Sequence, residues 1–186
     1  MAYRETLVQR EQHRIHVRDH PGAGPPIILM HGFPDNLHLY DRLVPYLSPP
    51  RRVVLFDFLG WGSSDKPSGY PYTTANQVGD LDAVITQLGL EQVLLVAHDA
   101  SGPPAIDWAL AQPGRVAGLV LLNTYYCEMP TLRPPEVIWL ATPVIRNVAR
   151  PVSQMFGNWV FRRMYRWQVG RFFRDADVRR EFVPLL

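Results

Sequence analysis

Four short, continuously apolar segments constrain the fold of this chain more than any other feature of its sequence. They are PIILM (26–30), RVVLFDF (52–58), QVLLVA (92–97) and VAGLVLL (116–122). Strands that are buried on both faces have such uninterrupted hydrophobicity, whereas strands exposed on one face alternate apolar and polar residues. The four segments therefore predict the strands of a parallel sheet that is covered by helices on both sides.

Helical patterns lie between these predicted strands. One apolar face is formed by Leu37, Tyr40, Leu43, Val44 and Leu47. A second helix is predicted to begin at Thr74-Ala75-Asn76-Gln77, which has the spacing of a capping box, and to end at Gly89. This alternation of strands and helices predicts an α/β fold with a doubly wound, mostly parallel sheet. The segments ETLVQR (5–10) and HRIHVRD (13–19) predict an antiparallel pair at one edge.

The composition changes near residue 124. Residues 1–124 contain 9 basic and 12 acidic side chains, whereas residues 125–186 contain 10 basic and 5 acidic ones. The second region has proline-punctuated helical patterns at about 135–149, 152–168 and 175–183. We therefore predict a core at 1–124 and a helical cap at 125–186. The arginines of the predicted cap are spaced as on solvated helix faces, so we expect no nucleic-acid partner.

Nothing in the sequence indicates a membrane segment or a secreted protein. The N-terminus is polar, and no apolar run approaches the roughly 20 residues that span a bilayer. The single cysteine, Cys127, can form neither an internal disulfide nor a cysteine-based metal site. We expect a cytoplasmic protein in which Cys127 is packed.

Asp99 occupies an unusual position, directly after an apolar strand and before a predicted helix. The surrounding residues Ala97, Ala100, Ser101 and Gly102 are small. A sharp strand-to-helix turn needs small neighbours and presents its central side chain at the carboxyl edge of the sheet, where α/β proteins bind ligands. Ser101 does not fit the central place, because Asp99 and Pro103 stand where small residues would be required. The pattern therefore predicts that Asp99 is presented for chemistry.

Three motifs together resemble the α/β-hydrolase family, in the branch that includes haloalkane dehalogenases and epoxide hydrolases. They are His31-Gly32-Phe33-Pro34 after the first apolar segment, the loop DFLGWGSSDKP (57–67), and His98-Asp99 with aspartate in the nucleophile's place. The similarity covers residues 15–124 in the correct order, and the helical region after it has the position of the family's cap. It implies an α/β-hydrolase fold.

The resemblance also implies a mechanism and a set of site residues. Asp99 would attack a saturated carbon and form an alkyl-enzyme ester, and the backbone N–H groups of Phe33 and Ala100 would form the oxyanion hole. His31 and Asp57 are expected to order loops. The substrate would be a small apolar organic molecule, with no cofactor and no metal. Candidates for the substrate pocket are Pro34, Tyr125, Tyr126 and Tyr165.

The residues around the nucleophile favour an epoxide over a haloalkane. Haloalkane dehalogenases of this kind usually bind halide with a tryptophan after the nucleophile, where this chain has Ala100, and Phe33 replaces a second halide donor. No arginine follows Asp99 at the positions that hold the carboxylate in fluoroacetate dehalogenases. Cap tyrosines could polarise an epoxide. A haloalkane dehalogenase remains the alternative.

The family's catalytic acid and histidine have no counterpart in these 186 residues. All six histidines, at positions 13, 16, 20, 31, 38 and 98, precede Asp99, and the last apolar segment ends before Asn123 rather than an acid. His38 fits an exposed helix face better than a substitute base. We therefore expect an incomplete hydrolase fold, inactive alone and prone to self-association through the edge of its sixth strand. The alternative is a non-catalytic interaction protein.

Overall fold

The computed structural model describes residues 2–126, 159, 163, 166, 167, 170 and 174–185. The chain divides into two compact units, Met1–Tyr126 and Cys127–Leu186. The first contains the sheet and every motif discussed above.

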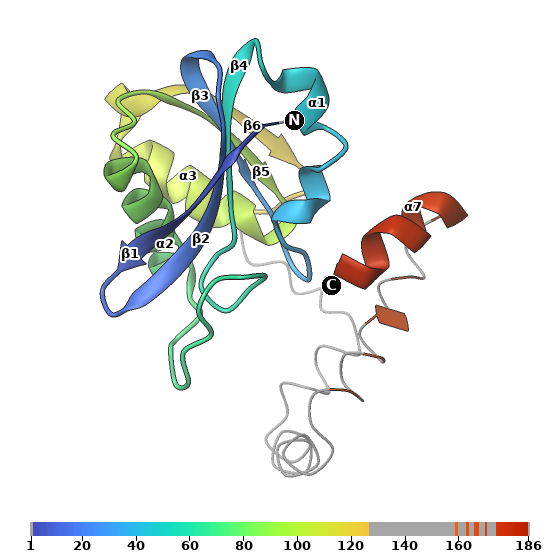
Figure 1. The fold of residues 1–186 in the computed structure, drawn as a ribbon. Coiled ribbons are helices and arrows are strands. Elements are labelled where there is room, and N and C mark those ends of the chain that lie inside the picture. Colours follow the sequence, from blue (N-terminus) through green and yellow to red (C-terminus); the bar gives the residue numbers. More distant parts are fainter. Residues whose placement is uncertain are drawn as a thin grey trace. The chain divides into compact units, whose positions relative to one another are not determined.

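The first unit is built on a six-stranded sheet with the order β1-β2-β4-β3-β5-β6 (Figure 1). The strands are β1 (Arg4–Arg10), β2 (His13–His20), β3 (Ala23–Met30), β4 (Arg51–Phe56), β5 (Val93–His98) and β6 (Val116–Leu122). Strands β4, β3, β5 and β6 run parallel, whereas β1 pairs antiparallel with β2, and β2 pairs antiparallel with β4. The predicted fold class and the predicted edge pair are both confirmed.

The parallel register brings three strand ends to the same level of the sheet. Met30 of β3 pairs with Ala97 of β5, and Ala97 pairs with Leu121 of β6. The residues that follow these strands therefore meet at one edge, the carboxyl edge of the sheet. This arrangement gathers the loop after β3, Asp99 after β5, and the segment after β6 around one point.

Two hydrophobic clusters cover the two faces of the sheet. One packs Leu81, Val84, Ile85 and Trp108 from helices α2 (Thr74–Gln87) and α3 (Gly102–Ala111) against alternate strand residues. The other packs η1 (Leu37–Tyr40) and α1 (Val44–Leu47) against the intervening strand residues, such as Leu29. Because successive strand side chains point to opposite faces, the continuously apolar strands β3, β4 and β5 supply both clusters. Burial on both faces was also predicted for β6 and is wrong there, because Val120, Leu121 and Leu122 are exposed.

The first predicted helix is interrupted in the structure. Residues 37–47 form a short 3-10 helix η1 (Leu37–Tyr40) and a separate short helix α1 (Val44–Leu47) rather than one helix. Pro45 lies in the first turn of α1 and has no N–H to donate, so a helix cannot pass through it with its hydrogen bonds intact. Of the predicted apolar face, Leu37, Tyr40 and Val44 are buried and Leu47 is half-buried, but Leu43 is exposed, so the prediction was wrong at that position.

Helix α2 begins and ends close to the predicted bounds. Its N-cap is Thr73, whose hydroxyl accepts the N–H of Asn76, so the cap lies one residue before the predicted Thr74. Gly89 follows the helix with a φ of 62°, in the left-handed region that glycine adopts without strain.

Of the second unit, the structure describes helix α7 (Ala176–Phe182) and the short helix η4 (Val183–Leu185). The Asp175 carboxylate caps α7 by accepting the N–H groups of Asp177 and Val178. This helix lies within the stretch 175–183 predicted to be helical. The predicted helix at 135–149 lies outside the described residues, and within 152–168 the four described residues are all helical.

Candidate active site at the Asp99 elbow

Asp99 lies at a sharp turn between β5 and the short helix η2 (Asp99–Ser101), which leads into α3. Its φ is 53°, in the left-handed region that is unfavourable for a residue with a β-carbon. Such backbone strain persists only where surrounding contacts hold the residue, and it is concentrated at functional sites. The turn has the geometry predicted from the small residues around Asp99.

Ser101 holds the turn from inside the protein. Its hydroxyl accepts the N–H of His98 at 2.9 Å and contacts two carbonyl oxygens, that of Met30 at 3.0 Å and that of His98 at 2.8 Å. Its side chain is buried, with 1% exposure. Ser101 therefore ties the end of β5 to the end of β3 and stands inside the turn rather than at its tip.

Two glycines make room for the elbow. A β-carbon on Gly32 would lie 2.5 Å from the Asp99 Cβ and 2.6 Å from its Oδ1, and one on Gly102 would overlap the Thr124 hydroxyl. Real β-carbons essentially never approach other atoms so closely. The need for glycine thus comes from the side chains of Asp99 and Thr124, which press against the backbones of the neighbouring loop and helix.

A backbone amide points directly at the Asp99 carboxylate. The N–H of Phe33, in the loop after β3, donates a 2.8 Å hydrogen bond to Asp99 Oδ1. The Phe33 side chain is 48% exposed and packs edge-on against Trp61, so only its backbone acts at the carboxylate. Ala100, the other predicted oxyanion donor, follows Asp99 directly in η2.

His31 holds the loop that carries Phe33, as the sequence analysis expected for a loop-ordering residue. Its Nδ1 lies 2.9 Å from the Gly32 carbonyl oxygen, and its Nε2 lies 3.2 Å from the Phe58 nitrogen. A carbonyl can only accept and an amide N–H can only donate, so these contacts fit a neutral ring protonated on Nδ1. Burial lowers the pKa of His31, which agrees with that form.

Asp57 holds two loops at the same edge of the sheet. Its carboxylate accepts the N–H groups of Leu37 and Ser63, each at 2.8 Å, and it is 2% exposed. Burial alone would raise the pKa of Asp57, but this effect is outweighed by the nearby His16 ring and the two N–H donors, so its pKa is lowered. Asp57 is therefore a charged acceptor within the structure, away from the Phe33 contact.

Two residues of this region were not singled out by the sequence analysis. The first is Asp35, whose pKa is raised to about 6 by burial and by the negative charge of Asp99. The second is Thr124, whose hydroxyl donates a 2.5 Å hydrogen bond to the Asp99 carbonyl oxygen. Asp35 comes directly after His31-Gly32-Phe33-Pro34, and Thr124 comes shortly after the sixth strand. The only sequence feature that could have indicated either residue is its place next to a motif or a strand end.

The residues predicted to line the substrate pocket lie in different surroundings. Pro34 follows Phe33 in the loop next to Asp99, and the Tyr125 side chain is 42% exposed. The Tyr126 hydroxyl donates to the Asp107 carboxylate on α3 at 2.8 Å, which gives this tyrosine a structural partner. Tyr165 lies outside the described residues.

His38, which the sequence analysis disfavoured as a base, lies in a surface ion cluster. Its Nδ1 is 2.6 Å from the Asp41 carboxylate, and both ring nitrogens lie 3.4 Å from the Arg18 guanidinium. These partners lie on β2 and at the end of η1, and neither is part of the elbow.

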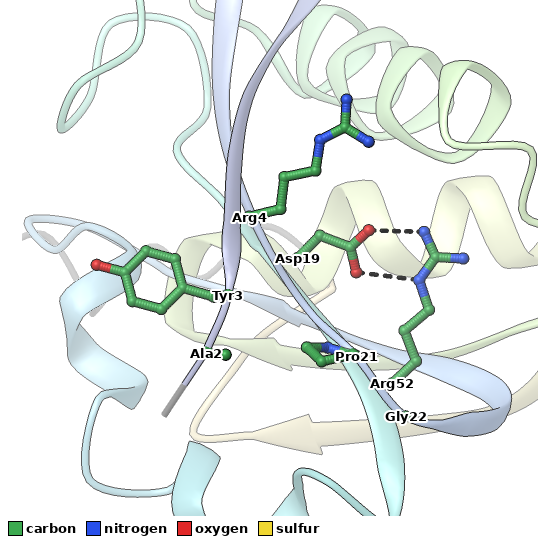
Figure 2. Close-up of a pocket in the computed structure, with 7 residues that line it drawn as sticks. All are labelled: Ala2, Tyr3, Arg4, Asp19, Pro21, Gly22 and Arg52. Atoms are coloured by element: carbon green, nitrogen blue, oxygen red, sulfur yellow. Dashed lines mark hydrogen bonds and ion pairs between the residues drawn. The ribbon is translucent and has the colours of Figure 1, made fainter.

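A surface pocket lies at the other end of the strands. Figure 2 shows Arg4, Asp19, Gly22 and Arg52 among its lining residues, with Arg52 paired to Asp19 through contacts of 3.0 and 2.7 Å. Gly22 precedes β3 and Arg52 lies at the start of β4, so the pocket is at the amino ends of strands whose carboxyl ends face Asp99. We therefore do not assign it to the elbow.

Within the described residues, the structure contains no cluster of three or more His, Cys, Asp or Glu side chains suited to a metal ion. The same part of the chain has no helix that is both long and apolar enough to cross a membrane.

Known proteins with similar sequences and structures include several hydrolases. A cis-3-alkyl-4-alkyloxetan-2-one decarboxylase of Shewanella oneidensis is 33% identical over 144 residues, which cover 75% of this chain and 45% of that protein. A fluoroacetate dehalogenase of a Burkholderia species is 38% identical over the same length, covering 75% and 43%. The chain thus spans less than half the length of these curated relatives.

A solved structure gives a similar result. A haloalkane dehalogenase from Agrobacterium tumefaciens C58 superposes with a TM-score of 0.74 at 25% identity, covering 89% of this chain and 57% of that one. Other similar proteins include haloalkane dehalogenases and epoxide hydrolases.

The model of the alpha/beta hydrolase fold family matches residues 25–148, which include most of β3, all of β4 to β6, the Phe33 loop and the elbow. The chain therefore belongs to the α/β-hydrolase fold family, with dehalogenases and epoxide hydrolases among its relatives.

Proposed function

We propose that Asp99 is the nucleophile of a hydrolase that forms an alkyl-enzyme ester with a small organic electrophile. The observation that carries the proposal is the position of the carboxylate: it lies on a strained turn at the carboxyl edge of the sheet, with its Oδ1 2.8 Å from the Phe33 N–H. A carboxylate that was only a helix cap would need neither the left-handed backbone nor an amide from another strand's loop.

The proposed first step is a displacement at carbon. A carboxylate oxygen of Asp99 forms a C–O bond to the substrate, and the bond from that carbon to its leaving group breaks. With an epoxide, the ring oxygen leaves carbon as an alkoxide, takes a proton from water and stays in the adduct as a hydroxyl group. With a haloalkane, halide departs. The helix that begins after Asp99 favours negative charge at this place.

The proposed second step is attack by water on the carbonyl carbon of the ester, which requires an oxyanion hole and a base. The Phe33 N–H already contacts Asp99, and the Ala100 N–H is proposed as the second donor. No histidine follows Asp99 in these 186 residues. We therefore expect a polypeptide of this sequence to stop at the ester.

An epoxide is the favoured substrate class, and a haloalkane is the second candidate. Neither the exposed Phe33 ring nor the methyl group of Ala100 offers a hydrogen-bond donor to halide. The haloalkane candidate is supported by the dehalogenases among the relatives. The fluoroacetate dehalogenase and the oxetanone decarboxylase extend the range of electrophiles worth testing.

Intact-protein mass spectrometry tests the proposal. The 186-residue chain is incubated separately with styrene oxide, 1,2-dibromoethane, fluoroacetate and a cis-3,4-dialkyloxetan-2-one. An epoxide adduct adds the mass of the whole epoxide, whereas a dibromoethane adduct adds the mass of that molecule less hydrogen bromide. The substrate that adds mass fastest identifies the class.

Two matched variants separate reaction at Asp99 from general alkylation. Asp99→Asn keeps the size of the side chain and is expected to abolish the adduct, whereas Glu91→Gln removes an exposed carboxylate and is expected to leave it unchanged. An adduct that persists in Asp99→Asn, or no adduct from any probe on a chain that circular dichroism shows to be folded, would contradict the proposal.

A further inference from the structure

We infer that Thr124 is a positioning residue that sets the orientation of the Ala100 N–H in the oxyanion hole. The inference rests on the proposed function in assigning Ala100 that role, and it adds a residue outside the elbow and the Phe33 loop. Thr124 follows β6 and reaches the elbow from the third strand end at this edge.

The Thr124 hydroxyl makes a well-defined contact. It donates to the Asp99 carbonyl oxygen at 2.5 Å, and its other near acceptor, the Tyr125 carbonyl, is farther away at 3.5 Å. The Asp99 carbonyl also accepts the N–H of Gly102 at the start of α3. A carbonyl oxygen has two lone pairs, so these two donors fill its capacity and fix its direction.

That carbonyl belongs to the same peptide unit as the Ala100 N–H. In the described part of the chain, cis peptide bonds occur only at Phe33-Pro34 and Ser48-Pro49, so the bond between Asp99 and Ala100 is trans. In a planar trans peptide the C=O and N–H bonds point in opposite directions. Holding the Asp99 oxygen with Thr124 therefore fixes the direction in which the Ala100 N–H points.

The local backbone explains why Thr124 can reach this oxygen. Asn123 has a φ of 45°, a left-handed conformation that asparagine tolerates better than most residues, and it turns the chain after β6. On the other side, Gly102 leaves space that a β-carbon would take from the Thr124 hydroxyl. The turn at Asn123 and the space at Gly102 together place the Thr124 hydroxyl beside the Asp99 carbonyl oxygen.

The inference predicts an effect on one half-reaction only. Displacement at the substrate carbon develops no negative charge on the Asp99 carboxyl group, whereas attack on the ester creates an oxyanion there. Hydroxylamine cleaves such an ester through the same kind of oxyanion and replaces the missing base. Removing an oxyanion donor outright slows catalysis roughly 100- to 1,000-fold, so a misdirected donor should cost about 10-fold.

The experiment compares three variants of the full chain. Thr124→Val removes the hydroxyl at constant shape, and Thr124→Ser retains it. Thr73→Val is the control, because it removes a hydroxyl that caps α2 and is far from Thr124 in the sequence. Styrene oxide labelling measures the first half-reaction, and hydroxylamine release measures the second. The residual dipolar coupling of the Ala100 N–H reports its orientation without any substrate.

We expect Thr124→Val to change the Ala100 coupling and slow hydroxylamine release about 10-fold, with labelling within about twofold of the unchanged chain. Thr124→Ser should restore both quantities, and Thr73→Val should alter neither. An unchanged Ala100 coupling in Thr124→Val would overturn the inference, whether or not an adduct forms. Equal slowing of both half-reactions that Thr124→Ser does not relieve would also overturn it. A chain that forms no adduct contradicts the proposed function, and the coupling then decides the inference alone.

Discussion

The α-carbon of Gly32 faces the Asp99 side chain so closely that a β-carbon there would lie 2.6 Å from Asp99 Oδ1. The loop that supplies the Phe33 N–H is therefore pressed against the carboxylate that it contacts. Glycine at position 32 permits a 2.8 Å hydrogen bond that any larger residue would displace.

The first prediction concerns this contact. We expect Gly32→Ala to slow labelling of Asp99 about 100-fold, because a misplacement of about 1 Å at a reacting centre costs that much. The rate of adduct formation by mass spectrometry measures it. Gly114→Ala is the matched control, because a β-carbon on Gly114 would meet nothing within 4 Å. Equal labelling rates in the two variants would show that the Phe33 loop does not constrain the carboxylate.

The second prediction concerns the tie between β5 and β3. Ser101→Ala removes the acceptor of the His98 N–H and the donor to the Met30 carbonyl, inside the protein. Leaving a buried polar group unpaired costs about 1–3 kcal/mol, so we expect the free energy of unfolding to fall by that amount. Urea unfolding measures it, with Ser63→Ala, at an exposed position, as the control. A loss no larger than that of the control would refute this role of Ser101.

The third prediction concerns Asp57. Asp57→Asn replaces one acceptor with an amide donor, so the N–H of Leu37 or Ser63 loses its partner, and about 1–3 kcal/mol of stability should be lost at pH 7. The lowered pKa of Asp57 means that its charged form stabilises the fold above about pH 4 and that this stability is lost as the pH falls further. The difference between the two proteins should therefore shrink below pH 4. A constant difference in urea unfolding from pH 7 to pH 3 would contradict this.

The fourth prediction concerns Asp80, which should have the opposite pH dependence. Its side chain is 1% exposed, and burial raises its pKa to about 6 despite the Leu59 N–H and Arg10 nearby. The protonated form is favoured in the folded state, so this residue contributes stability that is full below about pH 4 and is lost as the pH rises through about 6.

Asp80→Asn tests this directly, because the amide oxygen can still accept the Leu59 N–H but the group no longer titrates. Each pKa unit corresponds to about 1.4 kcal/mol, so the stability of the unchanged chain relative to the variant should fall by as much as about 3 kcal/mol between pH 4 and pH 7. Urea unfolding at intermediate pH values measures the difference. A difference that grew with pH would mean that the charged form is the stable one, held by Arg10.

The strands and the elbow were predictable because each leaves a local pattern. Strands β3, β4 and β5 are apolar where they are buried on both faces, and the sharp turn at Asp99 requires small neighbours. Strand β6 is equally apolar but largely exposed, so the pattern predicted the strand and not its burial. Pro45, by contrast, lies within an apolar pattern of helical spacing. That pattern predicted one continuous helix, because it takes no account of the N–H that proline lacks. Two adjacent threonines at 73 and 74 both fit an N-cap, and only the observed hydrogen bond to Asn76 distinguishes them.

The less predictable parts of the site depend on contacts between distant segments. Thr124 meets Asp99 because β6 lies beside β5 in the sheet, and no spacing in the sequence encodes that register. The raised pKa of Asp35 likewise arises from burial and the Asp99 charge across a gap of 64 positions in the chain. The hydrogen bond from the Tyr126 hydroxyl to Asp107 on α3 likewise joins residues 19 positions apart.

The central claim is that Asp99 is the nucleophile, and the most direct measurement is the site of covalent labelling. The 186-residue chain is treated with styrene oxide, digested and sequenced by tandem mass spectrometry. We expect one ester on Asp99, released by hydroxylamine, while Asp35 and Asp107 remain unmodified. A label on another carboxylate of the folded chain, or none on Asp99, would contradict it.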